Sequence, residues 1–486
     1  MLARGVPPGT SLADRLAAAY SALGGPLRPA TFYVGGTLSA LGRKSTARMD
    51  LYRLVNFGRV SFRKLFIAAL AFAAAPVAAQ YEVKIVPGTR DLALEFKVSG
   101  DAKHPMTLAT RGAAWGLEPQ VQDVKCGKIP LARDTNGAWV VPPGCTRISW
   151  KVSADVISDG GGDPSKQRTL AVGPRPWFLL AEPTSILRPV GVSEPSSIED
   201  PATSDHLVGA RPLPSGRFWV PAPNNAPEFY VLGRAAAVER ATGNFHVTYV
   251  ADDLARVERL GLDCLHAKAL SYLTTVVSLP KDAPDSSRTL LVIWLAAVQA
   301  RGPLGGAAGS RSFVANYVID PLADEKLNRA MTVAIVAHEQ FHQLVDILRG
   351  PMRPLPAWLS ESLAHYYGLK ALVRAEDSQS AHDVRNQFVD PSRIAADGLL
   401  ELDRRYSSGN RSAYGLFYSQ GATLWSEVDS AIGAATGGKQ SLDDYVKDLL
   451  TSPLSDDGSL PKAFLDRLRS VAGPQIDRIF ERYVGR

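Results

Sequence analysis

Two histidines and two glutamates in one part of the chain have the types and spacing of a metal site. His338 and His342 are four positions apart, and Glu339 follows the first of them. Residues i and i+4 of a helix lie on one face, so both imidazoles can bind a single ion. Glu361, nineteen positions after His342, can provide the third ligand of a catalytic zinc and leave one position open for water. This is the HExxH pattern of zinc hydrolases, in which the glutamate serves as general base beside Zn2+, the role expected of Glu339.

The residues around this motif predict two helices joined by a short loop. An apolar segment runs into the motif, Gly350 ends the pattern, and a proline-rich connection precedes a second helix from Ala357. Such helices can bring His338, His342 and Glu361 to one point. The alternative is a pair of histidines in a helix that contacts nothing catalytic. Apolar residues recur at helical spacing through the motif: Val333, Ala337, Phe341, Leu344 and Leu348.

Other polar residues near the motif give less specific signals. Metal-bound imidazoles usually donate their second ring nitrogen to a neighbouring acceptor, and Asp346 or His365 could belong to this outer shell. Solvent-facing helix positions are the alternative for both. The remaining histidines lack ligand spacing and are expected in surface or core positions: His104, His206, His246, His266 and His382.

The N-terminal part has the features of a secretory leader. Residues 63–80 combine a basic flank, a short apolar run and small residues before a predicted cleavage after Ala79. Met49 opens a leader of ordinary length. The apolar run is short for a membrane span, and an uncut anchor helix is the alternative. The expected location is periplasmic or secreted, with residues 1–79 as leader, 49–79 as its signal peptide and 1–48 as an upstream extension.

The positive charge of the chain belongs to this leader. The whole chain has a net charge of +6, and residues 1–79 contain ten basic and two acidic side chains, which leaves −2 for residues 80–486. An apolar fraction of 45% is ordinary for a soluble globular protein. Nothing in this composition favours a nucleic-acid surface or stable membrane insertion. The sequence does not fix the oligomeric state.

The chain has three cysteines. Cys126 and Cys145 flank a stretch rich in glycine and proline, and in an oxidising compartment a disulfide between them would stabilise the fold by about 3 kcal/mol. Two free thiols are the alternative. Cys264 lies in an apolar helical segment and is expected to be a buried, unreactive thiol.

The region after the leader is predicted to be a β-sandwich. Residues 80–200 alternate or are rich in β-branched side chains, and clusters of glycine, proline and aspartate separate these segments. Helical periods dominate later in the chain, so the fold class is α+β. The expected strands are residues 81–86, 92–98, 146–152 and 169–172.

A second domain, residues 205–486, is predicted to be mostly helical toward its C-terminus. A glycine-rich loop at residues 302–309 precedes an expected edge strand at 312–319, and the two helices of the zinc motif follow. Before them we expect strands at residues 228–232, 244–250 and 290–295 and one long helix at 252–277.

The motif resembles that of the gluzincins, thermolysin-like zinc peptidases whose third ligand is a glutamate on a following helix. The eighteen-residue gap between His342 and Glu361, the WLSESLA segment at 358–364 and the preceding β region are similar to aminopeptidase-type members. The glycyl aminopeptidase family fits best, with the alanyl and leucyl aminopeptidases as cousins. The resemblance implies a thermolysin-like zincin domain, Zn2+ held by His338, His342 and Glu361, and peptide or protein substrates.

A tyrosine downstream extends the resemblance. Those families have a Tyr-x-x-Gly segment whose tyrosine donates its hydroxyl to the oxyanion, and FYSQGATL at residues 417–424 matches it. The resemblance therefore implies a catalytic role for Tyr418. A packing role is the alternative, because Tyr414, Tyr366 and Tyr367 compete for the position.

Two departures separate the chain from the aminopeptidases. Their glycine-rich strand before the zinc helix has a glutamate that binds the substrate amine, whereas the corresponding Ser312–Val318 has none. The remainder after Tyr418 leaves no room for the PDZ domain that the glycyl family often carries. Exopeptidase and endopeptidase activity both stay open, as does a non-catalytic zinc-containing module that binds peptides or proteins. Glu339 favours catalysis, because metal binding alone does not need it.

Overall fold

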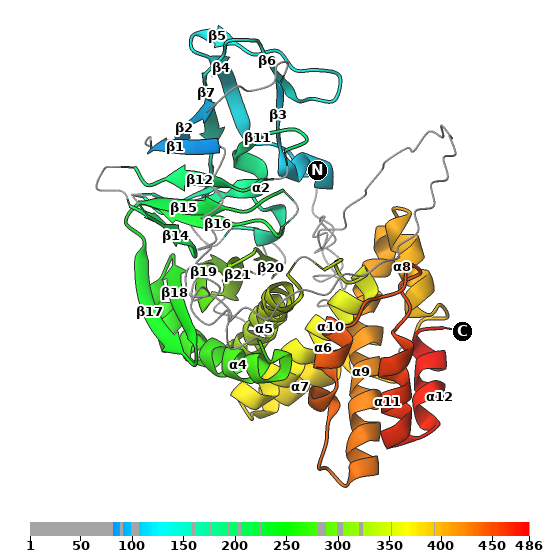
Figure 1. Cartoon of the computed structure of the whole chain (residues 1–486). Helices are drawn as coiled ribbons and strands as arrows, with labels where there is room; N and C mark the ends of the chain where they lie inside the picture. Colours follow the sequence, from blue (N-terminus) through cyan, green and yellow to red (C-terminus); the bar gives the residue numbers. More distant parts are fainter. Residues whose placement is uncertain are drawn as a thin grey trace, which may run out of the picture.

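The computed structural model describes residues 81–485 apart from 88–90, 99–105, 158–160, 175, 193, 202–205, 215, 224, 280–287, 299–304, 320–323, 351 and 393. Sheets form the N-terminal part and helices the C-terminal part (Figure 1), as the predicted α+β class requires. The predicted leader and signal peptide lie outside the described residues. Within the part that the structure describes, no helix has the length and apolar character needed to cross a bilayer.

Three sheets build the N-terminal part. Their strand orders are β14-β15-β12-β1-β2-β7-β4-β5, β13-β16-β10-β9-β8 and β11-β3-β6. The strands are β1 (Tyr81–Pro87), β2 (Asp91–Val98), β3 (Met106–Thr110), β4 (Val121–Cys126), β5 (Ile129–Pro130), β6 (Trp139–Val141), β7 (Arg147–Ser153), β8 (Asp155–Ile157), β9 (Leu170–Val172), β10 (Trp177–Ala181), β11 (Leu187–Pro189), β12 (Ser196–Glu199), β13 (Leu207–Val208), β14 (Pro212–Leu213), β15 (Arg217–Val220) and β16 (Phe229–Leu232). Short helices η1 (Arg111–Trp115), η2 (Pro164–Lys166) and α2 (Glu182–Ser185) connect them.

These sheets enclose a shared core, because their strands alternate in polarity as the sequence predicts. In β7, Ile148, Trp150 and Val152 are buried while Arg147 and Lys151 are exposed. The strands expected in this region are all present. β16 pairs with β10, so the N-terminal sheets extend to Leu232. The domain boundary near residue 200 stays a prediction.

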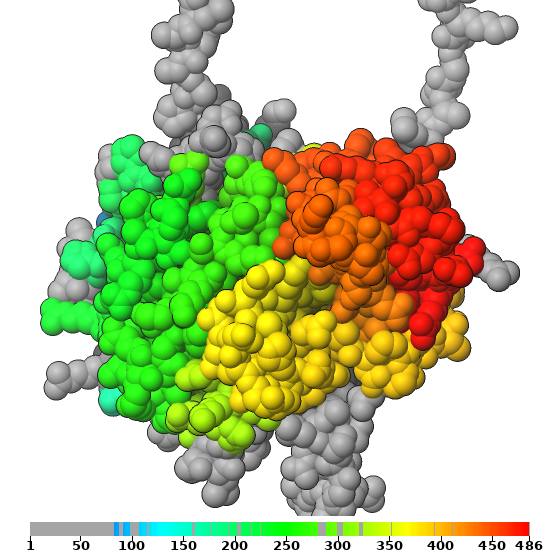
Figure 2. Space-filling view, turned by 90° about the horizontal axis from the view of Figure 1, so that it is seen from below, coloured from blue at the N-terminus to red at the C-terminus, as the bar shows by residue number. Residues whose placement is uncertain are grey.

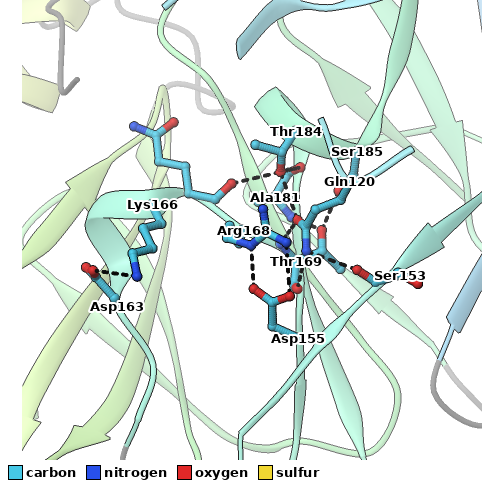
Figure 3. Close-up of polar contacts among 11 residues, drawn as sticks. Gln120, Ser153, Asp155, Asp163, Lys166, Arg168, Thr169, Ala181, Thr184 and Ser185 are labelled. Atoms are coloured by element: carbon cyan, nitrogen blue, oxygen red, sulfur yellow. Dashed lines mark hydrogen bonds and ion pairs between the residues drawn. The ribbon is translucent and has the colours of Figure 1, made fainter. Parts of the chain in front are cut away.

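One buried glutamine joins two of these sheets (Figure 3). The Gln120 amide nitrogen donates to the carbonyls of Ser153 and Thr169, each at 3.0 Å. Its oxygen accepts from the Thr169 amide at 2.5 Å and from the Thr184 hydroxyl at 3.1 Å. Both polar atoms of this amide group therefore have hydrogen-bond partners, so its burial costs little free energy. We call this cluster the Gln120 junction.

A further sheet of five strands lies between the N-terminal sheets and the helices. Its order is β17-β18-β19-β21-β20, with β18, β19 and β21 parallel and the two outer strands antiparallel. In β19, Trp294 faces the core under the helices, whereas Ile293 faces the core shared with the N-terminal sheets. The bounds are β17 (Ala236–Thr242), β18 (Phe245–Ala251), β19 (Thr289–Ala297), β20 (Gly306–Ala308) and β21 (Ser312–Val318).

Two expectations for this part were wrong. The segment 312–319 is an interior strand, because β20, which the sequence places in a loop, pairs with β21 and forms the edge. Its Gly-Ala-Ala composition carries no strand signal. The helix expected at 252–277 is two helices, α3 (Leu254–Arg259) and α4 (Leu262–Val277), because Gly261 between them has a φ of 66° and turns the chain.

The C-terminal part is a packed group of helices. Figure 2 shows α4 and its neighbours in green beside the later helices in yellow to red. The zinc-motif helices are present as predicted, and Asp324 caps the first by accepting from the amides of Lys326 and Leu327. The helices are α5 (Glu325–Arg349), α6 (Ala357–Ala375), α7 (Gln379–Phe388), α8 (Leu399–Ser407), η5 (Arg411–Ala413), α9 (Tyr414–Thr436), η6 (Leu442–Asp444), α10 (Val446–Thr451), α11 (Lys462–Ala472) and α12 (Gln475–Tyr483).

Two glycines let α5, α6 and α9 approach closely. A Cβ atom on Gly368 of α6 would lie 3.0 Å from the backbone nitrogen of His338. A Cβ atom on Gly421 of α9 would lie 2.2 Å from the Cβ atom of Ser362. Side chains at these positions would push the helices apart. The helices that carry the candidate site are thus held together by backbone contact.

Of the two predictions for the cysteines, one is confirmed and one is wrong. Cys126 and Cys145 form the predicted disulfide. Cys264 is exposed rather than buried. The helix α4 buries Leu262, His266 and Leu270, and position 264 lies on the opposite, solvent-facing side.

Candidate metal centre

Three predicted ligands meet at one point. The Nε2 atoms of His338 and His342 are 3.0 Å apart, and Oε2 of Glu361 lies 3.3 Å from the first and 3.5 Å from the second. Two ligands bound to zinc at about 2.1 Å in tetrahedral geometry are separated by about 3.4 Å. The helix spacing on α5 and the short connection to α6 therefore produce the expected arrangement of donor atoms.

The chemistry of these donors also fits a cation. Glu361 is 4% exposed, and its Oε2 has no hydrogen-bond partner among the residues that the structure describes, although both imidazoles lie close to it. A buried carboxylate oxygen normally has a partner. Nitrogen and carboxylate donors in this number suit Zn2+ and leave a fourth position for water or substrate. The three residues fit a catalytic zinc.

The ligands influence each other's protonation. Burial disfavours a charged His342, but three nearby carboxylates together more than offset this and raise the pKa of His342 to about 9: Glu361 first, then Glu339 and Asp346. Burial likewise opposes ionisation of Glu361, yet both imidazoles hold its pKa below the ordinary value. Because metal ligands must lose their protons, protons and a metal ion compete for these groups.

The surroundings of the histidines include one residue besides the two expected ones. The Ser360 hydroxyl lies 3.2 Å from Nδ1 of His342, so this serine occupies the outer position. Sequence reasoning missed it, although it directly precedes Glu361. Asp346 is exposed at the next helix turn, and its charge raises the pKa of His342, so its place in the outer shell stays a prediction. His365 is buried, and its ring centroid lies 5.7 Å from that of His338.

Glu339 lies between α5 and the edge strand β20. It is 7% exposed, and the backbone N–H of Ala308 donates to its carboxylate. A Cβ atom on Gly306 would be 2.9 Å from Cγ and 3.0 Å from Oε1 of Glu339. Burial raises the pKa of Glu339, and the two histidines oppose this shift. The proposed base is thus confined by the strand that sequence analysis took for a loop.

Tyr418 projects from α9 toward the ligands. Its ring centroid lies 5.5 Å from that of His338, and burial raises its pKa well above the ordinary value. Two competing tyrosines have other contacts: Tyr366 donates to Asp429 at 2.5 Å, and Tyr367 stacks on Phe341. Tyr414 packs 5.3 Å from Tyr418. Position therefore favours Tyr418 over Tyr366 and Tyr367 but not over Tyr414, which lies near the same carboxylates. The catalytic role of Tyr418 stays a prediction.

Comparison with known proteins gives one line of support. Neither a protein-family model nor a curated protein sequence matches the chain. Among solved structures, the fold is similar to that of an aminopeptidase N family protein from Idiomarina loihiensis, with a TM-score of 0.56 and 12% sequence identity. The alignment covers 76% of this chain and 70% of that chain. At this identity the similarity establishes the fold alone, which is aminopeptidase-like.

Proposed function

We propose that this chain is a zinc-dependent peptidase, periplasmic or secreted, that hydrolyses peptide bonds in peptide or protein substrates. One observation carries the proposal: the donor atoms of His338, His342 and Glu361 have the separations of a zinc site, and Glu339 lies beside them. The aminopeptidase-like fold supports peptide hydrolysis among the reactions that this motif serves. The predicted signal peptide and the disulfide support an oxidising compartment.

The residues divide the work of hydrolysis. A zinc ion held by the three ligands would supply a Lewis acid for the peptide carbonyl and lower the pKa of water. Glu339 accepts the proton of the attacking water and passes it to the leaving amine. The Tyr418 hydroxyl donates to the oxyanion. The close packing of α5, α6 and α9 holds these groups in place.

The edge strand suits an extended substrate. Among the described residues β20 ends its sheet and borders Glu339, so a peptide that pairs with it would pass the proposed base. Like β21, it contains no glutamate to bind a free amine. The proposed domain is of the thermolysin-like zincin type, and the absent glutamate sets it apart from the aminopeptidases that it resembles.

The test is the variant Glu339→Gln. It should retain stoichiometric zinc but lose peptide hydrolysis by about 10²–10⁴-fold, because the carboxylate that accepts the proton is gone. Bound zinc is measured by elemental analysis, and hydrolysis by digestion of a peptide library with and without chelator. The library also shows whether cleavage occurs at termini or inside peptides.

The control is Glu325→Gln, the same substitution at the exposed first turn of α5. It should behave as wild type. Full hydrolysis by Glu339→Gln would remove Glu339 as the base. Retention of peptides without cleavage by the wild-type protein would favour the non-catalytic binding module instead.

A further inference from the structure

A chain of four buried polar side chains lies beneath the metal site. The Tyr249 hydroxyl is 2.7 Å from Nδ1 of His266, and Nε2 of His266 is 3.0 Å from Oε1 of Gln340. Nε2 of Gln340 then donates to Oε1 of Gln343 at 3.1 Å. Each of the four residues is at most 1% exposed. Apolar residues would fill this space at lower cost, since buried polar groups must satisfy every hydrogen bond.

The direction of this chain follows from its chemistry. The Gln340 oxygen can only accept, so Nε2 of His266 carries the proton and Nδ1 accepts from Tyr249. Burial lowers the pKa of His266 to about 4, which keeps the ring neutral. Each donor thus points to the next residue, from β18 through α4 to α5. Consecutive bonds of this kind strengthen one another.

The chain ends on the turn between β20 and β21. Nε2 of Gln343 donates to the carbonyls of Gly309 and Ser312, at 3.0 and 2.9 Å. From the opposite side, the Ser310 amide donates to the Pro227 carbonyl at 2.6 Å. The turn is therefore held between α5 and the segment that leads into β16.

This turn directly follows the residues that confine Glu339. Gly309, which Gln343 holds, is next to Ala308, whose N–H donates to the Glu339 carboxylate. Gly306 lies against the same carboxylate. A turn released from Gln343 would let β20 move relative to α5, and the proposed base would lose its fixed position.

We propose that Gln343 is a positioning residue for the peptidase reaction, which holds the β20–β21 turn and thereby keeps Ala308 in contact with Glu339. The inference rests on the proposed function. A residue that only packed α5 against the sheet would need volume but no hydrogen bonds to the turn. The distinction can be measured, because packing affects stability whereas positioning affects kcat.

The experiment compares Gln343→Met with Gln120→Met. Both replace a buried amide that bridges two carbonyls, and only the first lies next to Glu339. Both variants should lower the melting temperature. Gln343→Met should keep stoichiometric zinc and lower kcat by about 10- to 100-fold with KM changed much less, the loss expected from a misplaced catalytic group. Gln120→Met should leave kcat and KM unchanged.

A folded, zinc-loaded Gln343→Met with wild-type kcat would overturn the inference while leaving the proposed function intact. A wild-type protein that binds zinc but cleaves no peptide would overturn the proposed function, and the inference with it. If Gln343→Met does not fold, Gln343→Asn replaces it. The shorter amide cannot bridge both carbonyls, so its kcat should fall at constant zinc content, and an unchanged kcat would contradict the proposal.

Discussion

Gln120 in the N-terminal sheets and Gln343 beneath the metal site are built in the same way. Each is buried, and each primary amide donates to two backbone carbonyls at 2.9–3.0 Å. The Gln120 oxygen accepts from Thr169, just before β9, and from Thr184 in α2, so that network stays within the N-terminal part. The Gln343 oxygen continues to Gln340, and its carbonyl partners lie next to the strand that touches Glu339.

The difference shows that burial and hydrogen bonding do not reveal what a polar network is for. Both clusters satisfy the same local chemistry and both should stabilise the fold. The Gln120 junction ends on backbone that carries no reactive group among the described residues. The Gln343 network ends beside a carboxylate in the candidate site. The Gln343 network can affect catalysis because the two carbonyls it binds lie next to the strand that contacts Glu339.

The largest expected effect is that of Glu361→Ala. Loss of a direct ligand should weaken zinc binding by more than the roughly 10–100-fold typical of an outer-shell partner, and hydrolysis should fall to background. Zinc content after dialysis and activity toward peptides measure both. Glu325→Ala, an exposed substitution on α5, should retain zinc. Wild-type zinc affinity in Glu361→Ala would exclude Glu361 from the ligand set. The Gln343 network would then no longer differ from the Gln120 junction by lying next to a catalytic zinc site.

A smaller effect is expected for Gly306→Ala. The new Cβ atom would lie 3.0 Å from Oε1 of Glu339, so the carboxylate must move, while the backbone of this strand is not in the left-handed region. We expect kcat to fall by about tenfold, with zinc content unchanged. Gly433→Ala in α9, where a Cβ atom would meet nothing within 4 Å, is the matched control. Unchanged kcat in Gly306→Ala would show that the contact between β20 and Glu339 does not matter.

The sequence predicted the ligands because their placement depends on local geometry. His338 and His342 share a face of any helix, and a short connection returns the chain to place Glu361 beside them. The disulfide likewise followed from two cysteines in one β region. The strand β20 could not be predicted, because Gly-Ala-Ala lacks both alternation and β-branched side chains. Its pairing with β21 and its approach to α5 are tertiary effects.

The network beneath the site escaped prediction for a related reason. Gln340 and Gln343 are ordinary helix residues by type, and His266 lies 74 positions before its partner Gln340. Hydrogen bonds between such distant residues exist only once α4 and α5 pack on the same sheet. His266 was expected in a surface or core position, and the structure places it in the core.

The smallest expected effect is the coupling between the two glutamines. Each single Met variant should lower the free energy of unfolding by about 1–3 kcal/mol, because buried backbone groups lose their partners. In the double variant these losses should add within about 0.5 kcal/mol, and kcat should equal that of Gln343→Met. Urea unfolding and steady-state kinetics measure both quantities.

A physical route between the two networks makes this result informative. The helix η2 packs against β20, and the Gly162 carbonyl near it accepts from the side chain of Asn316 in β21 at 3.1 Å. If strain at the Gln120 junction passed through η2, the double variant would deviate from additivity and Gln120→Met alone would change kcat. If instead the losses in stability add and Gln120→Met has the kcat of the wild type, η2 does not couple the two networks. Gln120 would then act on folding alone, and Gln343 on folding and catalysis.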